Sequence, residues 1–395
     1  MSLLSLFLLI LTIASADNWA VLVCGSEGFD NYRHHADVSH AYQILKRGGF
    51  DPDHIITMMY NDVPFDEKNP FPGQLYNHPG DDSPDVYEGV VVDYDKESVS
   101  DENLIKVLTG DESAGGKVLK TTKEDNVFLY FSDHGSRDLL ALPGGYLHSQ
   151  DLIDAIKTMH DKQMYKKFLL YIEACFSGSM FLKLPEDLNV VAVTAANPKE
   201  YSYGYYCGEE SIVKGKNFGT CIGDEFSISW MEHVDSIDRK ENLEDQFNYL
   251  VKQVTNSHVS RYGDTSFKND SIGEFIGFAS ANTKYVEPQY SFVQWDSRDN
   301  KLLYSRYMAE HTTGSEQKKW QAAVKEELFN REQIDRYFAS ITKNPRYYQQ
   351  SEGVKNVNCY KKAIDQFTAI MGKSDYALKY FDVFANMCNE NGHSF

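Results

Sequence analysis

The sequence predicts an α/β sandwich with a mainly parallel sheet, followed by a helical module. Two observations predict the sheet: near-continuous apolar runs recur through residues 17–200, and segments of helical period separate them. Runs without strict alternation are typical of strands that are buried on both faces of a parallel sheet. Strands that alternate with helices form βαβ units, which place layers of helices against the sheet.

The predicted elements follow in chain order. Apolar runs predict six strands, at residues 19–24, 54–60, 89–94, 126–131, 167–172 and 189–195. Helical period predicts helices between them, at 35–47, about 100–109 and 149–163, and glycines directly follow the first two. Residues 225–258 predict two more helices in the same layer, and a last core strand is predicted at about 274–279.

The C-terminal part of the chain is predicted to be separate. Residues 281–315 carry few periodic signals and are predicted to be a linker or activation segment, whereas residues 316–395 are predicted to form a helical domain. Charge divides the chain near the same point, because residues 1–280 carry a net charge of −21 and the remainder carries +2. Such an acidic body lacks a phosphate-binding surface, so we expect no nucleic-acid partner.

Residues 1–16 are predicted to be a signal peptide. An apolar run from Leu3 to Ile13 precedes Ala14-Ser15-Ala16, and signal peptidase accepts small residues at such positions. About 11 apolar residues are too few to cross a core of ~30 Å, so we expect no membrane span. The expected location is the secretory pathway: a lysosome- or vacuole-like compartment, the cell surface or the extracellular space. The sequon at Asn269 then predicts glycosylation.

The secretory context predicts two disulfides. Cys207 and Cys221 bracket a Gly-rich loop, and Cys359 and Cys388 both lie in the C-terminal part, so each pair is predicted to form a bond. Cys24 lies in an apolar run and is predicted to be a buried thiol, which leaves Cys175 without a partner.

Polar clusters follow two of the predicted strands. Residues 132–135 (SDHG) follow one apolar run, and residues 173–178 (EACFSG) follow another. Ligands bind open α/β sheets at the carboxyl ends of the strands, so His134 and Cys175 are candidates for one site. Taken singly, each could be a structural histidine or a packed thiol. Together they supply the thiolate and imidazole that cysteine protease chemistry needs.

On these residues the sequence resembles the legumains, the asparaginyl endopeptidases or vacuolar processing enzymes of the caspase-like cysteine protease clan. The shared segments are residues 21–45, 132–135, 171–180, 193–200 and 223–233. The resemblance runs from about Trp19 to Phe278 and resumes at 359–367 and 377–388, which look like the family's helical pro-domain. It implies a caspase-like three-layer sandwich for the peptidase domain, residues 17–280.

The resemblance also implies catalytic roles. Cys175 would be the nucleophile and His134 the general base and acid, while backbone N–H groups of Gly135 and Cys175 would hold the oxyanion. Asn31 matches a residue that helps to orient the histidine. Asp133 matches a position that is open to chemical modification in relatives.

The specificity pocket implied by the resemblance uses Arg33, Glu173 and Asp224, with Ser202 as a fourth contributor. An asparagine carboxamide presents one acceptor and two donor hydrogens. Arg33 can donate to its oxygen while the two carboxylates accept from its nitrogen. An ionised aspartate would instead face two like charges. A purely structural ion-pair cluster is the alternative interpretation.

The implied activity is that of a cysteine endopeptidase, a hydrolase that cuts proteins and peptides after Asn, and after Asp at acid pH. The resemblance implies an autoinhibited, acid-activated zymogen that its own C-terminal pro-domain inhibits, with self-cleavage at Asn300 or Asn282. Asn300 is favoured because it lies further from the last predicted core strand. Cystatin-type inhibitors are a further implied partner class, and no metal or cofactor is expected.

The charge division predicts how the C-terminal part is held. Basic side chains would lie over the acidic rim at neutral pH, and the candidates are Lys318, Lys319, Lys361 and Lys362. Protonation of the rim carboxylates would remove these attractions, so the contact should loosen in acid.

Other activities remain open at this point: a transpeptidase or ligase, a caspase-like protease with another specificity, or a non-catalytic binding protein on the same fold. Two departures from the family bear on specificity. Phe176 follows the predicted nucleophile where relatives usually carry an acidic residue, and the segment at 203–221 is longer than expected.

Overall fold

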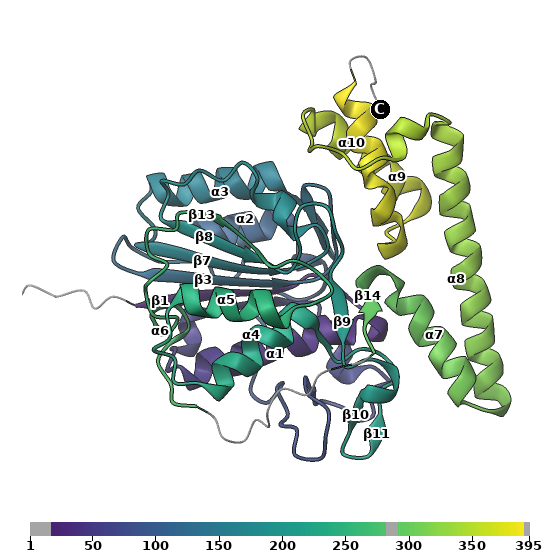
Figure 1. Cartoon of the computed structure of the whole chain (residues 1–395), viewed down its shortest axis with the longest axis horizontal. Helices are drawn as coiled ribbons and strands as arrows, with labels where there is room; N and C mark the ends of the chain where they lie inside the picture. The colour runs from purple at the N-terminus through teal and green to yellow at the C-terminus, as the bar shows by residue number, and fades with distance from the viewer. Residues whose placement is uncertain (1–16, 282–290, 292, 391–395) are drawn as a thin grey trace, which may run out of the picture.

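The computed structural model describes residues 17–281, 291 and 293–390 (Figure 1). The predicted signal peptide at residues 1–16 and the candidate cleavage site Asn282 lie outside the described residues. None of the helices in the described ranges is long and apolar enough to span a membrane.

A six-stranded sheet forms the centre of the molecule, in the order β13-β8-β7-β3-β1-β2. Its strands are β1 (Asn18–Cys24), β2 (Ile55–Met59), β3 (Asn126–Ser132), β7 (Lys167–Glu173), β8 (Val190–Thr194) and β13 (Ser260–Gly263). Only β13 runs antiparallel to its neighbour, and the other ladders are parallel. The predicted mainly parallel sheet is therefore confirmed.

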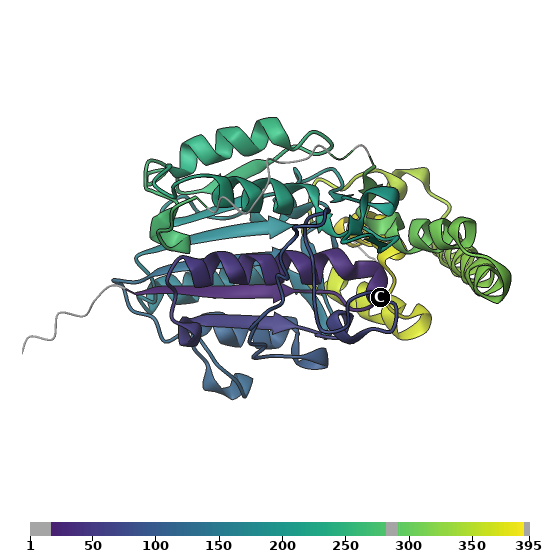
Figure 2. The same ribbon diagram turned by 90° about the horizontal axis from the view of Figure 1, so that it is seen from below.

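Helices cover both faces of this sheet, which gives three layers (Figures 1 and 2). One face carries α1 (Tyr32–Arg47), α4 (Glu225–Ser236), α5 (Leu243–Gln253) and the short α6 (Gly273–Ile276), and the other carries α2 (Asp101–Thr109) and α3 (Ser149–Asp161). A hydrophobic core lies on each face of the sheet, and successive β1 side chains point into one and then the other. Leu22 packs on the α1 side and Val23 on the α2 side. This alternation explains why the strands are apolar throughout.

Two predicted strands are wrong. The run at 89–94 pairs with the sheet only through a bridge between Tyr94 and Met58, and Val91 is 49% exposed. Only the end of this run lies beside the edge strand β2, so its valines do not pair with a strand of the sheet. The stretch predicted as a strand at 274–279 contains α6 instead, which buries Phe275 and Ile276 against the face of the sheet near β1 and β3.

Small strand groups extend the carboxyl edge of the sheet. They are β4 (Gly135–Ser136), β5 (Leu139–Leu142) and β6 (Gly145–His148) in one group, β9 (Tyr203–Tyr205), β12 (Gly223–Asp224) and β14 (Trp295–Asp296) in a second, and β10 (Ile212–Val213) with β11 (Lys216–Asn217) in a third. Both predicted disulfides are present, and the Cys207–Cys221 bond closes the loop that contains the third group.

The C-terminal part, which we call the tail (residues 293–390), lies against the carboxyl edge of the sheet (Figures 1 and 2). Its helices are α7 (Asn300–His311), α8 (Gly314–Ile341), α9 (Val357–Met371) and α10 (Phe381–Asn389). Phe338, Phe367 and Phe384 form the centre of its own hydrophobic core, and the Cys359–Cys388 bond joins α9 to α10.

The predicted linker at 281–315 is not without structure. From Trp295 onward it forms β14, a 3-10 turn at Ser297–Asp299 and α7, so helix begins at Asn300 rather than near 316. Tertiary packing explains the difference, since Tyr304 of α7 is buried between Phe29 and Trp320. Sequence periodicity does not report contacts of this kind.

Candidate active site

The sheet brings His134 and Cys175 to one place. Strands β3 and β7 are neighbours, and their last residues, Ser132 and Glu173, are in register. His134 and Cys175 each follow two residues later at the same edge, and both are buried. The two polar clusters therefore lie at the same edge of the sheet.

The thiol of Cys175 is packed close to backbone. The Ser202 N–H donates to Cys175 Sγ at 3.3 Å. Burial raises the pKa of the Cys175 thiol to about 11, which the positive charge of Arg298 partly opposes. A Cβ on Gly135 would lie 2.4 Å from the Cys175 carbonyl oxygen, so only glycine allows this approach. A protonated thiol requires a base before it can attack a carbonyl carbon.

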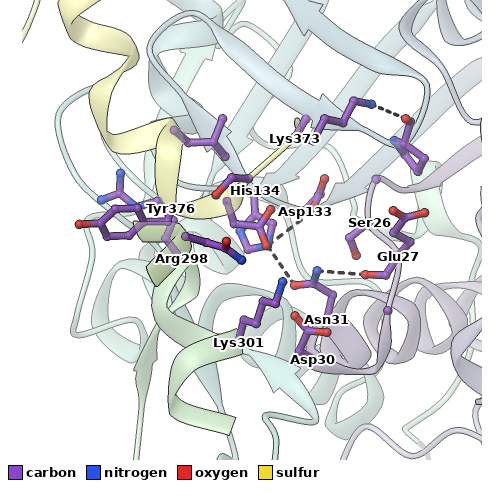
Figure 3. Close-up of a pocket in the computed structure, with 18 of the residues that line it drawn as sticks. Ser26, Glu27, Asp30, Asn31, Asp133, His134, Arg298, Lys301, Lys373 and Tyr376 are labelled. Carbon is purple, nitrogen blue, oxygen red and sulfur yellow. Dashed lines mark hydrogen bonds and ion pairs between the residues drawn. The ribbon is translucent and has the colours of Figure 1, made fainter. Parts of the chain in front are cut away.

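The His134 ring is held by polar groups from both parts of the chain. Its Nε2 lies 2.9 Å from Oδ1 of Asn31 (Figure 3) and 3.3 Å from the Asp375 carboxylate of the tail. Burial lowers the pKa of His134, but the carboxylates of Asp375 and Asp133 raise it and the net shift is upward. Asp375 in turn has its pKa held down at about 2, because His134, with the charges of Lys301 and Arg33, outweighs burial. The two groups therefore form an ion pair.

Asp133 and His34 complete the surroundings of the imidazole. Burial raises the pKa of Asp133 to about 7, although the neighbouring His134 opposes the rise. His34 Nδ1 lies 3.4 Å from Asp133 Oδ1, and the His34 ring meets the His134 ring edge-to-face at 5.1 Å. Burial, with the charge of Arg33, holds the pKa of His34 well below its usual value, so His34 is neutral. The contact of His34 with His134 was not predicted, because nothing in the sequence around His34, which directly follows Arg33, indicates it.

The four residues of the predicted specificity pocket lie together. Arg33 Nε donates to Asp224 Oδ1 at 2.9 Å, and Glu173 Oε2 accepts from the N–H and hydroxyl of Ser227 at 3.1 and 3.0 Å. Within the described residues, the other oxygens of the two carboxylates, Glu173 Oε1 and Asp224 Oδ2, accept no well-formed hydrogen bond, although His34 Nε2 lies 3.5 Å from Asp224 Oδ2. Buried acceptors of this kind are costly unless a ligand satisfies them.

A fifth pocket residue, Asp37, was missed by sequence reasoning. Its carboxyl group accepts from Asn77 Nδ2 at 2.7 Å and shares a hydrogen bond with Asp224. Burial and repulsion from Asp224 hold the pKa of Asp37 well above its usual value, so Asp37 carries a proton that it can donate. The signal was available, because Arg33 and Asp37 are four residues apart on α1 and therefore share a helix face.

A segment of the tail lies in the same cleft. Strand β14 pairs antiparallel with β9, and the Ser297 N–H continues the ladder by donating to the Ser202 carbonyl at 3.3 Å. Arg33 Nη2 donates to Ser297 Oγ at 2.6 Å, and Ser297 Oγ lies 3.5 Å from His134 Nδ1. The tail thus contacts the arginine of the pocket and the imidazole at once. No hydrogen bond joins Cys175 to His134 among the described residues.

A polar cavity of about 570 Å³ lies beside the imidazole, between the body and the tail (Figure 3). Asn31, Asp133 and His134 line it from one side, and Lys301, Lys373 and Tyr376 line it from the tail. The tail therefore leaves space beside the imidazole even though Asp375 contacts it.

Ion pairs and hydrogen bonds outside the cleft also hold the tail against the body. Arg137 pairs with Asp382 at 3.2 Å, and Lys361 pairs with Asp151 at 2.5 Å. Ser136 Oγ donates to the Leu378 carbonyl, and Tyr360 OH donates to the Arg137 carbonyl.

Of the four predicted basic anchors, Lys361 makes the expected ion pair, whereas Lys319 pairs with Glu316 on its own helix. Two other pairs have the reverse arrangement. The acidic residues Asp375 and Asp382 of the tail pair with His134 and Arg137 of the body, whereas the prediction placed basic groups on the tail and acidic groups on the body.

Two other predicted sites have defined positions. Asn300, the favoured self-cleavage site, is the first residue of α7 and is buried, with its amide donating to the Asp30 carbonyl and to Thr220 Oγ1. Asn269 lies in an exposed turn, as an acceptor of a glycan must.

Comparison with known proteins places this geometry in context. Residues 18–280 match the family described as the Peptidase C13 family. The vacuolar-processing enzyme delta-isozyme of Arabidopsis thaliana is 39% identical over 95% of this chain and 87% of its own length. Legumain of Mus musculus is 38% identical over 94% of this chain and 88% of its own length. Hemoglobinase of Schistosoma mansoni is 44% identical over 72% of this chain and 66% of its own length. A solved structure of caspase-1 from Spodoptera frugiperda aligns with 69% of this chain and 94% of that chain at 9% identity and a TM-score of 0.38.

Proposed function

The chain belongs to the peptidase C13 family and is a cysteine peptidase, and on this premise we propose that it hydrolyses peptide bonds directly after asparagine. The observation that carries the proposal is the pair of buried oxygens that accept no well-formed hydrogen bond within the described residues, Glu173 Oε1 and Asp224 Oδ2, beside the buried guanidinium of Arg33. A carboxamide satisfies all three groups, since its oxygen accepts from Arg33 and its N–H₂ donates to the carboxylates.

Aspartate fits this pocket only when it is protonated. Three carboxyl groups, Asp37, Glu173 and Asp224, surround the single guanidinium, and burial raises the pKa of each. Because burial already disfavours the ionised form of each of these groups, a further ionised carboxylate would be disfavoured for the same reason and would leave acceptors without donors. Protonation of the substrate side chain, whose ordinary pKa is about 3.9, removes the charge and supplies one donor. Cleavage after aspartate is therefore expected only at acid pH.

Cys175 and His134 would perform the reaction. His134 takes the proton of the Cys175 thiol, and the sulfur attacks the carbonyl carbon of the asparagine residue. The oxyanion forms beside the backbone N–H groups of Gly135 and Cys175, and His134 returns the proton to the leaving amine. Water, deprotonated by the same imidazole, then cleaves the thioester and restores the thiol. Asn31, 2.9 Å from the ring, would orient the imidazole through these steps.

We further propose that the chain is made as an inactive precursor that its tail inhibits. Support comes from contacts of the tail with both working parts of the site: Ser297 with Arg33, and Asp375 with His134. While Asp375 holds the imidazole as a cation, His134 cannot act as a base. The serine side chain has no amide group to donate to Glu173 and Asp224, so the segment around Ser297 would occupy the cleft without being a good substrate.

Acid would release this inhibition. Asp375 has a pKa of about 2 when docked, below its usual value of 3.8. Its contribution to docking is therefore complete above about pH 4 and is lost as pH falls through the interval to 2. His134, whose pKa is raised, contributes below its usual pKa and loses that contribution as pH rises. The pair thus holds the tail most strongly at mildly acid pH, and release requires a pH near or below 4.

Self-cleavage would complete the activation. Because Asn300 is buried at the start of α7, it becomes available only after that helix has separated from the body. The names of the vacuolar-processing relatives support a vacuole- or lysosome-like location, where low pH is available. Protein substrates with asparagine before the cleaved bond, the tail itself and cystatin-type inhibitors are the partners we propose.

Three fluorogenic tripeptides that differ only in a final Asn, Asp or Arg test the proposed activity. Acid-treated full-length protein should hydrolyse the Asn peptide at neutral to mildly acid pH, and Cys175→Ala protein treated identically should not. Equal or faster hydrolysis of the Arg peptide would refute the proposed specificity.

A further inference from the structure

We propose that Tyr201 and Phe176 form the subsite for the side chain that directly follows the cleaved bond, and that this subsite selects a cationic side chain. The inference rests on the proposed cleavage after asparagine and adds to it a second determinant of the substrate. It arises from the tail segment that lies in the cleft.

The register of that segment identifies the subsite. Strand β14 runs antiparallel to β9, and Ser297 both continues this ladder to Ser202 and contacts Arg33. Ser297 therefore lies at the position that asparagine takes in the proposed substrate, although its carbonyl oxygen also accepts from Arg33 Nη2 at 3.3 Å, so its backbone is not held as that of a reacting substrate would be. Arg298 follows it in the chain and occupies the position directly after the cleaved bond.

Arg298 lies in an aromatic environment. Its guanidinium carbon is 3.3 Å from the centroid of the Tyr201 ring and 5.7 Å from that of Phe176, and the residue is 5% exposed. The two rings meet edge-to-face at 5.3 Å. A guanidinium or ammonium group is attracted to the negative face of such a ring, most strongly where water is excluded.

The subsite is fixed relative to the nucleophile. Phe176 directly follows Cys175 and has a left-handed backbone with φ of 56°, and its N–H donates to the Glu200 carbonyl at 2.8 Å. This bond ties the residue after the nucleophile to the residue before Tyr201. Both rings are therefore positioned by the same backbone that positions Cys175, and a substrate meets a preformed surface.

Arg137 is the competing charge. Its guanidinium lies 5.6 Å from the Phe176 ring, and it pairs with Asp382 of the tail. If the tail leaves, Arg137 loses this partner and could instead attract an acidic side chain after the cleaved bond. The Tyr201 ring favours a cation because Arg298, rather than Arg137, is stacked on it.

The test uses internally quenched peptides of one sequence, Trp-Asp-Asn-X, with X as Arg, Gln or Glu, and a coumarin tripeptide that ends in Asn and has no residue after it. With acid-activated full-length protein, we expect kcat/KM for Arg to exceed that for Gln by about fivefold, and Glu to be the poorest. In Tyr201→Ala protein the Arg/Gln ratio should fall to about one, whereas Tyr201→Phe protein should keep it.

Each outcome is decisive. A ratio near one in the unmodified protein, or a preference for Glu, overturns the subsite, and the latter assigns the position to Arg137. If the coumarin peptide is cleaved in these cases, the proposed asparagine specificity stands and only this inference fails. If the coumarin peptide and all three longer peptides resist, both fail. Should Tyr201→Ala protein not fold, Tyr201→Leu protein takes its place, with the same loss expected.

Discussion

The Asp375 carboxylate of the tail lies 3.3 Å from Nε2 of His134. The same nitrogen also contacts Asn31. An anion from one end of the chain thus stabilises the protonated form of the residue that the reaction would use as a base. Each partner shifts the pKa of the other in the direction that keeps the pair ionised. Inhibition and acid sensitivity would therefore share one contact.

Replacing Asp375 with asparagine should weaken the inhibition. Asp375→Asn removes the negative charge and keeps the size of the side chain, so His134 loses its counterion and becomes a base at lower pH. We expect tripeptide hydrolysis by uncut precursor at pH 7 to rise by about fivefold, the amount that a partly exposed ion pair supplies. Activation should also begin at a higher pH than in the unmodified precursor.

Lys361→Gln, which removes an ion pair remote from the imidazole, is the matched control for that change. It should loosen the tail without altering the pH at which His134 acts. Identical pH profiles for the two variants would show that Asp375 has no specific effect on the imidazole.

Ser297→Asn should convert the tail segment into a substrate. The new carboxamide can reach Glu173 Oε1 and Asp224 Oδ2, which accept no well-formed hydrogen bond among the described residues. The bond after residue 297 should then be cut within one molecule, at a rate independent of protein concentration. N-terminal sequencing should find a fragment that begins at Arg298 and is absent from the Cys175→Ala, Ser297→Asn double variant. An intact chain would contradict the alignment of Ser297 with the pocket.

Much of the fold could be predicted because the strands are buried on both faces, which leaves an apolar run in the sequence at each of them. His134 and Cys175 could be placed together for the same reason, since adjacent parallel strands end at one edge. The contacts of Ser297 and Asp375 could not be predicted, because they depend on how the tail packs on the body. Asp37 was missed even though its spacing from Arg33 was visible.

Asp224 and Asp37 should contribute differently to the pocket. Asp224→Asn removes a carboxylate that accepts from the substrate amide, and the Asn/Asp selectivity should fall by about tenfold, the effect of one lost buried hydrogen bond. Asp37→Asn can still donate to Asp224 and should keep most of the selectivity, whereas Asp37→Leu cannot. Ratios of kcat/KM for the Asn and Asp tripeptides measure this. Equal effects of Asn and Leu at position 37 would exclude a hydrogen-bonding role.

The pH dependence of the Asp/Asn ratio tests the carboxylate pocket most directly. Acid-activated protein should be assayed with matched tripeptides ending in Asn and Asp between about pH 3.5 and pH 7, in buffers of constant ionic strength. Because only a protonated aspartate fits beside Glu173 and Asp224, the ratio should be near zero at pH 7 and should climb as pH falls toward about 3.9. A ratio that stays flat across this range would contradict the pocket that we propose.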